Sequence, residues 1–86
     1  MSVREDLIRA NKEKRVGEYI LTYRARHNLS QVQFGAKVGV TSQTIYSIEA
    51  KLQKPSKLTL EKIILTLEGD EKNESQHQQS ENVQGV

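Results

Sequence analysis

Residues 30–49, with the sequence SQVQFGAKVGVTSQTIYSIE, carry the pattern that decides the fold. Gly39 divides the stretch into two halves, and each half has apolar residues at helical spacing. These apolar residues are Phe34, Val38, Ile45 and Ile48. Glycine readily adopts the left-handed conformation that ends many helices, and Thr41 suits the capping position before a new helix. The stretch therefore predicts two short helices, Gln31–Val38 and Ser42–Ala50.

The two predicted helices must cross steeply, because the turn Gly39–Thr41 is too short for them to run antiparallel. A close crossing needs a small residue at the contact, which Gly35 supplies, and a positive φ at the turn, which Gly39 supplies. Val40 fills the angle between the helices. Two helices joined in this way form a helix-turn-helix.

The second helix of this pair has one side with no obvious packing role. At about 100° per residue, Ile45, Ile48 and Leu52 share one sector, which we expect to face the core. The opposite sector holds small or polar residues and one tyrosine: Ser42, Gln43, Tyr46 and Ser47. A helix face that adds little to a core is available for binding.

The rest of the chain predicts further helices and no strand, so the fold class is all-α, a compact bundle of four to five helices. One helix is expected over Val16–His27, and another is expected after Pro55, capped by Ser56 or Thr59. Their predicted inward residues are Val16, Ile20, Tyr23, Leu60, Ile63, Ile64 and Leu67. Residues 1–14 are either a short helix that begins at a capping box or a loose basic arm.

Charge separates the body of the chain from its end. The 86 residues carry a formal net charge of +2, but residues 1–67 hold 12 basic and 6 acidic residues, a net of +6, and residues 68–86 hold 1 and 5, a net of −4. A basic body favours a polyanionic partner. Residues 69–86 are too polar to bury a core and are expected to be a flexible, disordered tail. We therefore divide the chain into residues 1–14, 15–68 and 69–86.

Composition argues against several other classes of protein. There is no cysteine for a disulfide or thiolate site, and His27 and His77 have no partner at ligand spacing, so neither a metal nor a cofactor is expected. A nucleophilic serine needs a histidine and a carboxylate to activate it, and the sequence offers no such combination. We therefore do not expect an enzyme. The charged N-terminus lacks a signal-peptide pattern, and no apolar run is long enough to span a membrane. A cytoplasmic protein is expected.

At these residues the chain resembles the Cro-like and phage-repressor-like family of XRE-type transcriptional regulators. The resemblance runs from about Val16 to Leu67 and rests on VGEYILTYRARHNLSQ, FGAKVGVTSQTIYSIE and KPSKLTLEKIILTL. It implies a lambda-repressor-like domain whose second motif helix enters the major groove of double-stranded DNA. It also implies a sequence-specific regulator, expected to be a repressor, of bacterial or phage origin.

The resemblance assigns roles to positions of this chain. The implied base readers are Ser42, Gln43, Tyr46 and Ser47. The expected phosphate contacts are Gln31, which also braces Ser42 or Gln43, together with Thr41, Lys51, Lys54 and Lys57. Arg24 and Glu49 match a family pair that bridges the helix Val16–His27 to the reading helix. The other residues with structural roles are Phe34, Gly35, Val38, Gly39, Val40, Ile45 and Ile48.

The chain also departs from the family pattern, and these departures leave alternatives open. Ala50 and Lys51 replace the usual turn after Glu49, so the reading helix is expected to run further. The acidic sequence EGDEKNES replaces a Leu-rich dimerising segment, so a homodimer is either absent or formed elsewhere, around Leu7 and Ile8. One alternative function is an antitoxin-type protein that binds promoter DNA and, through its tail, a protein partner. Another is a protein-interaction module that keeps the fold without binding DNA.

Overall fold

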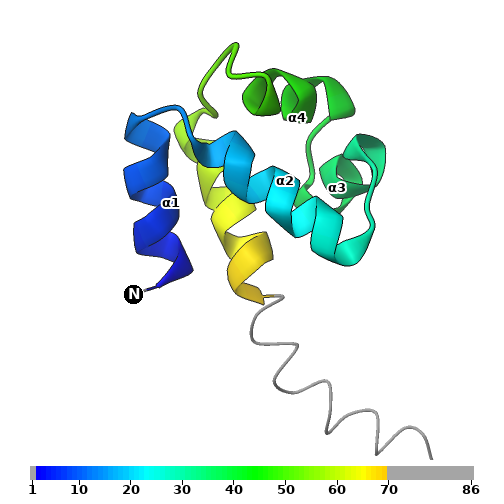
Figure 1. Cartoon of the computed structure of the whole chain (residues 1–86), viewed down its shortest axis with the longest axis horizontal. Coiled ribbons are helices and arrows are strands. Elements are labelled where there is room, and N and C mark those ends of the chain that lie inside the picture. The colour runs from blue at the N-terminus through cyan, green and yellow to red at the C-terminus, as the bar shows by residue number, and fades with distance from the viewer. Residues whose placement is uncertain (1, 70–86) are drawn as a thin grey trace, which may run out of the picture.

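The computed structural model describes residues 2–69, which contain five helices and no strand, as the sequence predicts. The helices are α1 (Val3–Lys12), α2 (Val16–His27), α3 (Gln31–Val38), α4 (Ser42–Glu49) and a last helix over residues 57–69 (Figure 1). Gly69, the first residue of the predicted disordered tail, is helical, and the rest of that tail lies outside the described residues.

Side-chain and left-handed caps set the boundaries of these helices. The side-chain oxygens of Ser30, Thr41 and Ser56 each accept a hydrogen bond from the backbone N–H three residues later, at 3.0, 3.2 and 3.1 Å. Asn28 and Gly39 end α2 and α3 with φ values of 54° and 99°. The predicted bounds of α2 and α3 are therefore confirmed, and Ser56 caps the last helix.

The expectation that the reading helix continues past Glu49 is wrong. Lys51 adopts a left-handed φ of 61°, which ends the helix although no glycine is present. The backbone N–H of Leu52 then donates to the carbonyl of Ser47 at 2.9 Å, which turns the chain away from the helix axis. Leu52 is consequently 67% exposed and does not join the inward sector that was predicted for it. Ala50 is the C-cap of α4.

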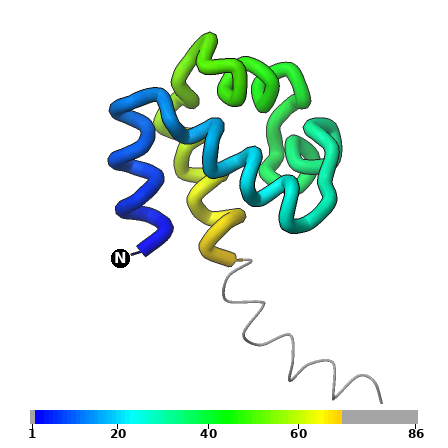
Figure 2. The backbone as a smooth tube through the Cα atoms, in the orientation of Figure 1, coloured from blue at the N-terminus to red at the C-terminus, as the bar shows by residue number. Residues whose placement is uncertain are grey.

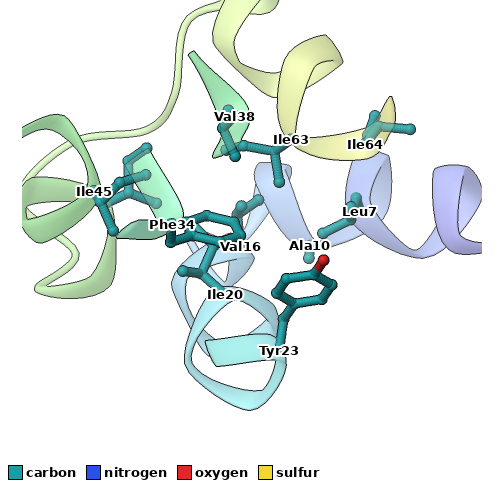
Figure 3. Close-up of a cluster of buried hydrophobic side chains, with 11 residues drawn as sticks. Leu7, Ala10, Val16, Ile20, Tyr23, Phe34, Val38, Ile45, Ile63 and Ile64 are labelled. Atoms are coloured by element: carbon teal, nitrogen blue, oxygen red, sulfur yellow. The ribbon is translucent and has the colours of Figure 1, made fainter. Parts of the chain in front are cut away.

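One apolar core joins all five helices. Its buried residues are Leu7, Ala10, Val16, Ile20, Tyr23, Phe34, Val38, Ile45, Ile48, Ile63 and Ile64, most of which Figure 3 labels. Leu7 is completely buried, so residues 3–12 form a packed helix and not a loose basic arm. Leu7 is therefore taken up by the core of its own chain, and of the two residues named for a dimer interface in this segment only Ile8 is exposed, so that interface stays a prediction.

Arg4 ties α1 to the helix over residues 57–69, which lies beside it (Figure 2). Its guanidinium nitrogens donate to both carboxylate oxygens of Glu61 at 2.9 and 2.8 Å, and one lies 3.6 Å from Glu68. The hydrogen bonds from Arg4 lower the pKa of Glu61. The first and last described helices are therefore joined on the side of the bundle formed by α1.

Two glycines allow backbones to approach closely around α4. A Cβ added at Gly35 would lie 2.7 Å from the carbonyl oxygen of Val40 in the turn, which fits the prediction that Gly35 lies at the close approach between the motif helices. A Cβ added at Gly17 would lie 2.6 Å from the carbonyl oxygen of Ile48 and 2.7 Å from the Cα of Glu49. The start of α2 thus touches the backbone at the end of α4, a contact that the sequence alone does not indicate.

Replacing Gly17 by alanine should destabilise the protein, although alanine favours helices more than glycine does. The new methyl group meets backbone atoms that cannot rotate away, so we expect a loss of about 1–3 kcal/mol from overpacking. Urea unfolding followed by circular dichroism measures the change in the free energy of unfolding.

The matched control is Gly69→Ala, because a Cβ at Gly69 meets nothing within 4 Å. This variant should be neutral or gain up to about 1 kcal/mol. Equal stability of the two variants would contradict the close approach of α2 and α4.

Candidate nucleic-acid interface

Helix α4 is anchored by its apolar side and leaves its polar side outward. It packs against α3 and α2, and Ile45 and Ile48 are almost completely buried (Figure 1). On the other side, Gln43 is exposed and Tyr46 is 48% exposed. Ser42 and Ser47 are partly exposed. The four implied base readers are therefore brought together on one accessible face.

Glu49 fixes the end of α4 to both neighbouring helices. Its carboxylate accepts hydrogen bonds from Nη1 of Arg24 at 2.9 and 2.8 Å and from Nε2 of Gln31 at 2.8 Å. Arg24 also donates from Nε to the carbonyl oxygen of Leu29 at 3.0 Å. The Glu49 side chain is only 7% exposed, so its charge is almost withdrawn from solvent. A partly buried pair of this kind fixes orientation more reliably than it adds stability.

Gln31 lies at the start of α3, where the sequence predicts a phosphate contact. Its side-chain amide donates to Glu49 and not to Ser42 or Gln43, the two residues that it was expected to brace. Its backbone N–H lies in the first turn of α3, where helix amides have no partner within the helix. Gln31 thus combines a side chain that positions α4 with a backbone group suited to an anion.

The three predicted phosphate-binding lysines differ in their surroundings. Lys51 donates from Nζ to Oε2 of Glu18 at 3.1 Å, and this bond, with one from Arg15, lowers the pKa of Glu18. Lys54 and Lys57 are exposed, and neither forms an ion pair with any residue in the described range. These two lysines, on either side of Pro55 in the sequence, are therefore accessible to an anionic partner.

Thr41 lies between the two motif helices and has a structural task. Its Oγ1 accepts from the N–H of Thr44 at 3.2 Å and lies 3.1 Å from the hydroxyl of Thr44. The side chain is exposed, so the cap of α4 sits at the surface of the motif.

Two further lysines near the motif were not picked out by the sequence reading. Lys62 places Nζ 3.5 Å from the carbonyl oxygen of Gly39, which is the turn of the motif. Lys37 is exposed in the last turn of α3. Neither forms an ion pair within residues 2–69. Lys62 is distant from the motif in the sequence, so only the tertiary fold shows that it lies near the turn. Lys37 could have been predicted from the sequence, because it is a charged residue within a predicted motif helix.

Five of the six acidic residues in positions 1–67 are already paired with arginine or lysine. They are Asp6, Glu13, Glu18, Glu49 and Glu61. The lysines near the motif have no such partners, except for Lys51. Near the motif, four lysines therefore have no acidic partner among residues 2–69, namely Lys37, Lys54, Lys57 and Lys62, and this distribution suits a polyanion.

Other kinds of site find little support in the described part of the chain. Within residues 2–69, no group of three His, Cys, Asp or Glu side chains is arranged to hold a metal ion. None of the helices described is long and apolar enough to cross a membrane.

A comparison with known families agrees with this geometry. A family model described as helix-turn-helix, of the Cro-like and XRE-like type, matches residues 20–71, which is more than half of the chain. No curated protein and no solved structure was found to match the chain. The matched segment begins within α2 and includes α3, the turn and α4, the elements that carry the exposed face and the Glu49 contacts. The chain therefore belongs to the Cro-like, XRE-type family of DNA-binding helix-turn-helix proteins.

Proposed function

We propose that this protein is a sequence-specific transcriptional regulator, acting as a repressor, that places α4 in the major groove of its operator. The observation that carries the proposal is the two-sided character of α4. Its apolar side and Glu49 are fixed to the body, while Gln43 and Tyr46 remain exposed on the other side. A recognition helix needs to be held rigidly by the rest of the domain and to have an accessible polar face.

In this proposal, base reading and backbone binding belong to different residues. Ser42, Gln43, Tyr46 and Ser47 contact base edges, because hydroxyl and amide groups match the donors and acceptors of the major groove. Lys54 and Lys57, which follow α4 in the chain, neutralise phosphates and contribute affinity without sequence preference. Gln31, Thr41 and Lys51 add contacts to the backbone; Lys51 must then exchange its hydrogen bond to Glu18 for a phosphate.

We further propose that residues 15–68 form the DNA-binding unit, with 1–14 as a supporting helix and 69–86 as an acidic extension. No catalytic role is proposed. A homodimer would present two copies of α4 to half-sites about 34 Å apart on a near-palindromic operator. The proposed setting is the cytoplasm of a bacterium, where a host or phage operator is accessible.

Removing the base-reading side chains should reduce sequence preference. In the double variant Gln43→Ala, Ser47→Ala, we expect the ratio of operator affinity to random-duplex affinity to fall about 10-fold or more, since each good base contact discriminates by about 1–3 kcal/mol. Binding isotherms on labelled duplexes at fixed salt measure both affinities.

The control is Thr22→Ala, which removes an exposed hydroxyl from α2 that bonds only the carbonyl of Glu18. This variant should keep the full ratio. Equal losses of operator and random-duplex affinity in the double variant would contradict the assignment of Gln43 and Ser47 as base readers.

Removing the two unpaired lysines should change the salt dependence of binding. Each phosphate contact contributes about 0.9 to the slope of log affinity against log salt concentration, so Lys54→Gln, Lys57→Gln should flatten the slope by about 2. Titrations at several salt concentrations on the operator and on a random duplex should give the same change in slope.

Arg9→Gln is the control for nonspecific loss of charge. Arg9 lies on α1, which Figure 1 places at the other edge of the bundle from α3. Its variant should keep the slope of the wild type. An unchanged slope in the lysine variant, or an equal change in the Arg9 variant, would remove Lys54 and Lys57 from the proposed phosphate contacts.

A further inference from the structure

The recognition helix has no positively charged residue. Residues 42–49 read SQTIYSIE and contain neither arginine nor lysine. Bidentate contact from arginine or lysine is the commonest way in which proteins recognise guanine in the major groove. The helix that we propose to enter the groove therefore lacks the usual readers of guanine.

The single acidic residue of α4 is also withheld from the groove. A glutamate can accept a hydrogen bond from the amino group of cytosine. The carboxylate of Glu49, however, already accepts from Arg24 and Gln31, and its side chain is only 7% exposed. Freeing it would release the end of α4 from α2 and α3, so Glu49 does not serve as a reader of cytosine.

The nearest lysine does not compensate for these absences. Lys51 follows the end of α4 in a left-handed turn and is not part of the helix. Its ammonium group donates to Glu18, which belongs to α2. The surface that α4 presents is therefore electrically neutral.

The groups that remain on this face match A·T pairs. The amide of Gln43 can bond N6 and N7 of adenine together. The half-exposed ring of Tyr46 offers an apolar surface to the methyl group of thymine. Ser42 and Ser47 carry hydroxyls that accept or donate to any base, so they do not alter this preference.

The spacing of these side chains limits how many base pairs they reach. Gln43 and Tyr46 stand three residues apart, so their Cβ atoms are neighbours about 5–6 Å apart on the helix surface. From Ser42 to Ser47 the helix rises about 7.5 Å, which is close to two steps of about 3.4 Å between base pairs. Helix α4 thus spans about three base pairs.

We propose that each half-site contains at least two adjacent A·T pairs read by α4, with an adenine against Gln43 and a thymine methyl against Tyr46. This proposal rests on the proposed DNA-binding function and specifies the class of sequence that the site accepts. Its source is the neutrality of the reading face, which follows from the burial of Glu49 and the position of Lys51.

The first test selects duplexes bound by the full chain from a random pool and sequences them. We expect enrichment of a motif in which each half-site has at least two adjacent A·T pairs where α4 reads it. An enriched motif with G·C pairs at these positions would overturn the proposal and leave sequence-specific DNA binding intact. A pool with no enriched motif would instead contradict the proposed function itself.

A second test separates contact with base edges from a preference for deformable A·T-rich DNA. Deoxyuridine in place of thymidine removes one methyl group, and it should weaken binding by about fourfold at one position of the motif, the factor expected for a buried methyl-sized group. Tyr46→Ala should lose this sensitivity, while Tyr46→Phe should keep it. Equal sensitivity in wild type and Tyr46→Ala would overturn the assignment of Tyr46.

The same comparison applies to Gln43 with 7-deazaadenine, which lacks the N7 acceptor. Wild-type protein should lose affinity when this base replaces one adenine of the motif. The Gln43→Ala variant should bind the substituted and the unsubstituted duplex with equal affinity. If both proteins respond equally, adenine is not read by Gln43. Thermal unfolding of each variant shows that the fold is retained.

Discussion

The carboxylate of Glu49 is the point on which the arrangement of the motif depends. It lies at the end of α4 and accepts hydrogen bonds from Arg24 of α2 and Gln31 of α3. Only two isoleucines of α4 are buried, so a helix of eight residues has little apolar surface with which to hold its place. The close approach of Gly17 to the same end brings α2 into direct contact with the α4 backbone. Because these contacts hold α4 in place, its outer face is not needed for packing and is accessible to a partner.

Because Glu49 has a structural role, its charge is not part of the outer face of α4. With its carboxylate occupied, the outer face of α4 carries amide, hydroxyl and aromatic groups and no net charge. The unpaired charges of Lys54 and Lys57 lie beyond the helix, in the connection to residues 57–69 and at its start. In the proposed function, sequence preference and salt-dependent affinity would therefore come from different segments, and a substitution could change one without changing the other.

Local signals were sufficient to predict most of the fold. Ser30, Asn28, Gly39 and Thr41 act on the backbone within a few residues, so the bounds of α2 and α3 were readable from the sequence. The end of α4 was not, because Lys51 adopts a positive φ that favours glycine or asparagine.

Contacts between distant segments were harder to anticipate. The approach of Gly17 to Glu49, the hydrogen bond from Gln31 to Glu49 and the burial of Leu7 each join elements that only the tertiary fold brings together. The candidate reading face was predictable because helical periodicity separates Ile45 and Ile48 from Gln43 and Tyr46. Its DNA-contacting roles came from the family resemblance, since exposure alone does not name a partner.

The most direct measurement is amide chemical-shift mapping of the isotope-labelled full chain during titration with a selected operator duplex. If α4 is mounted by Glu49 and enters the major groove, the largest changes will fall on residues 42–47 and on the first turn of α3, with small changes on α1. The opposite pattern, with large changes on α1 and none in α4, would contradict the account.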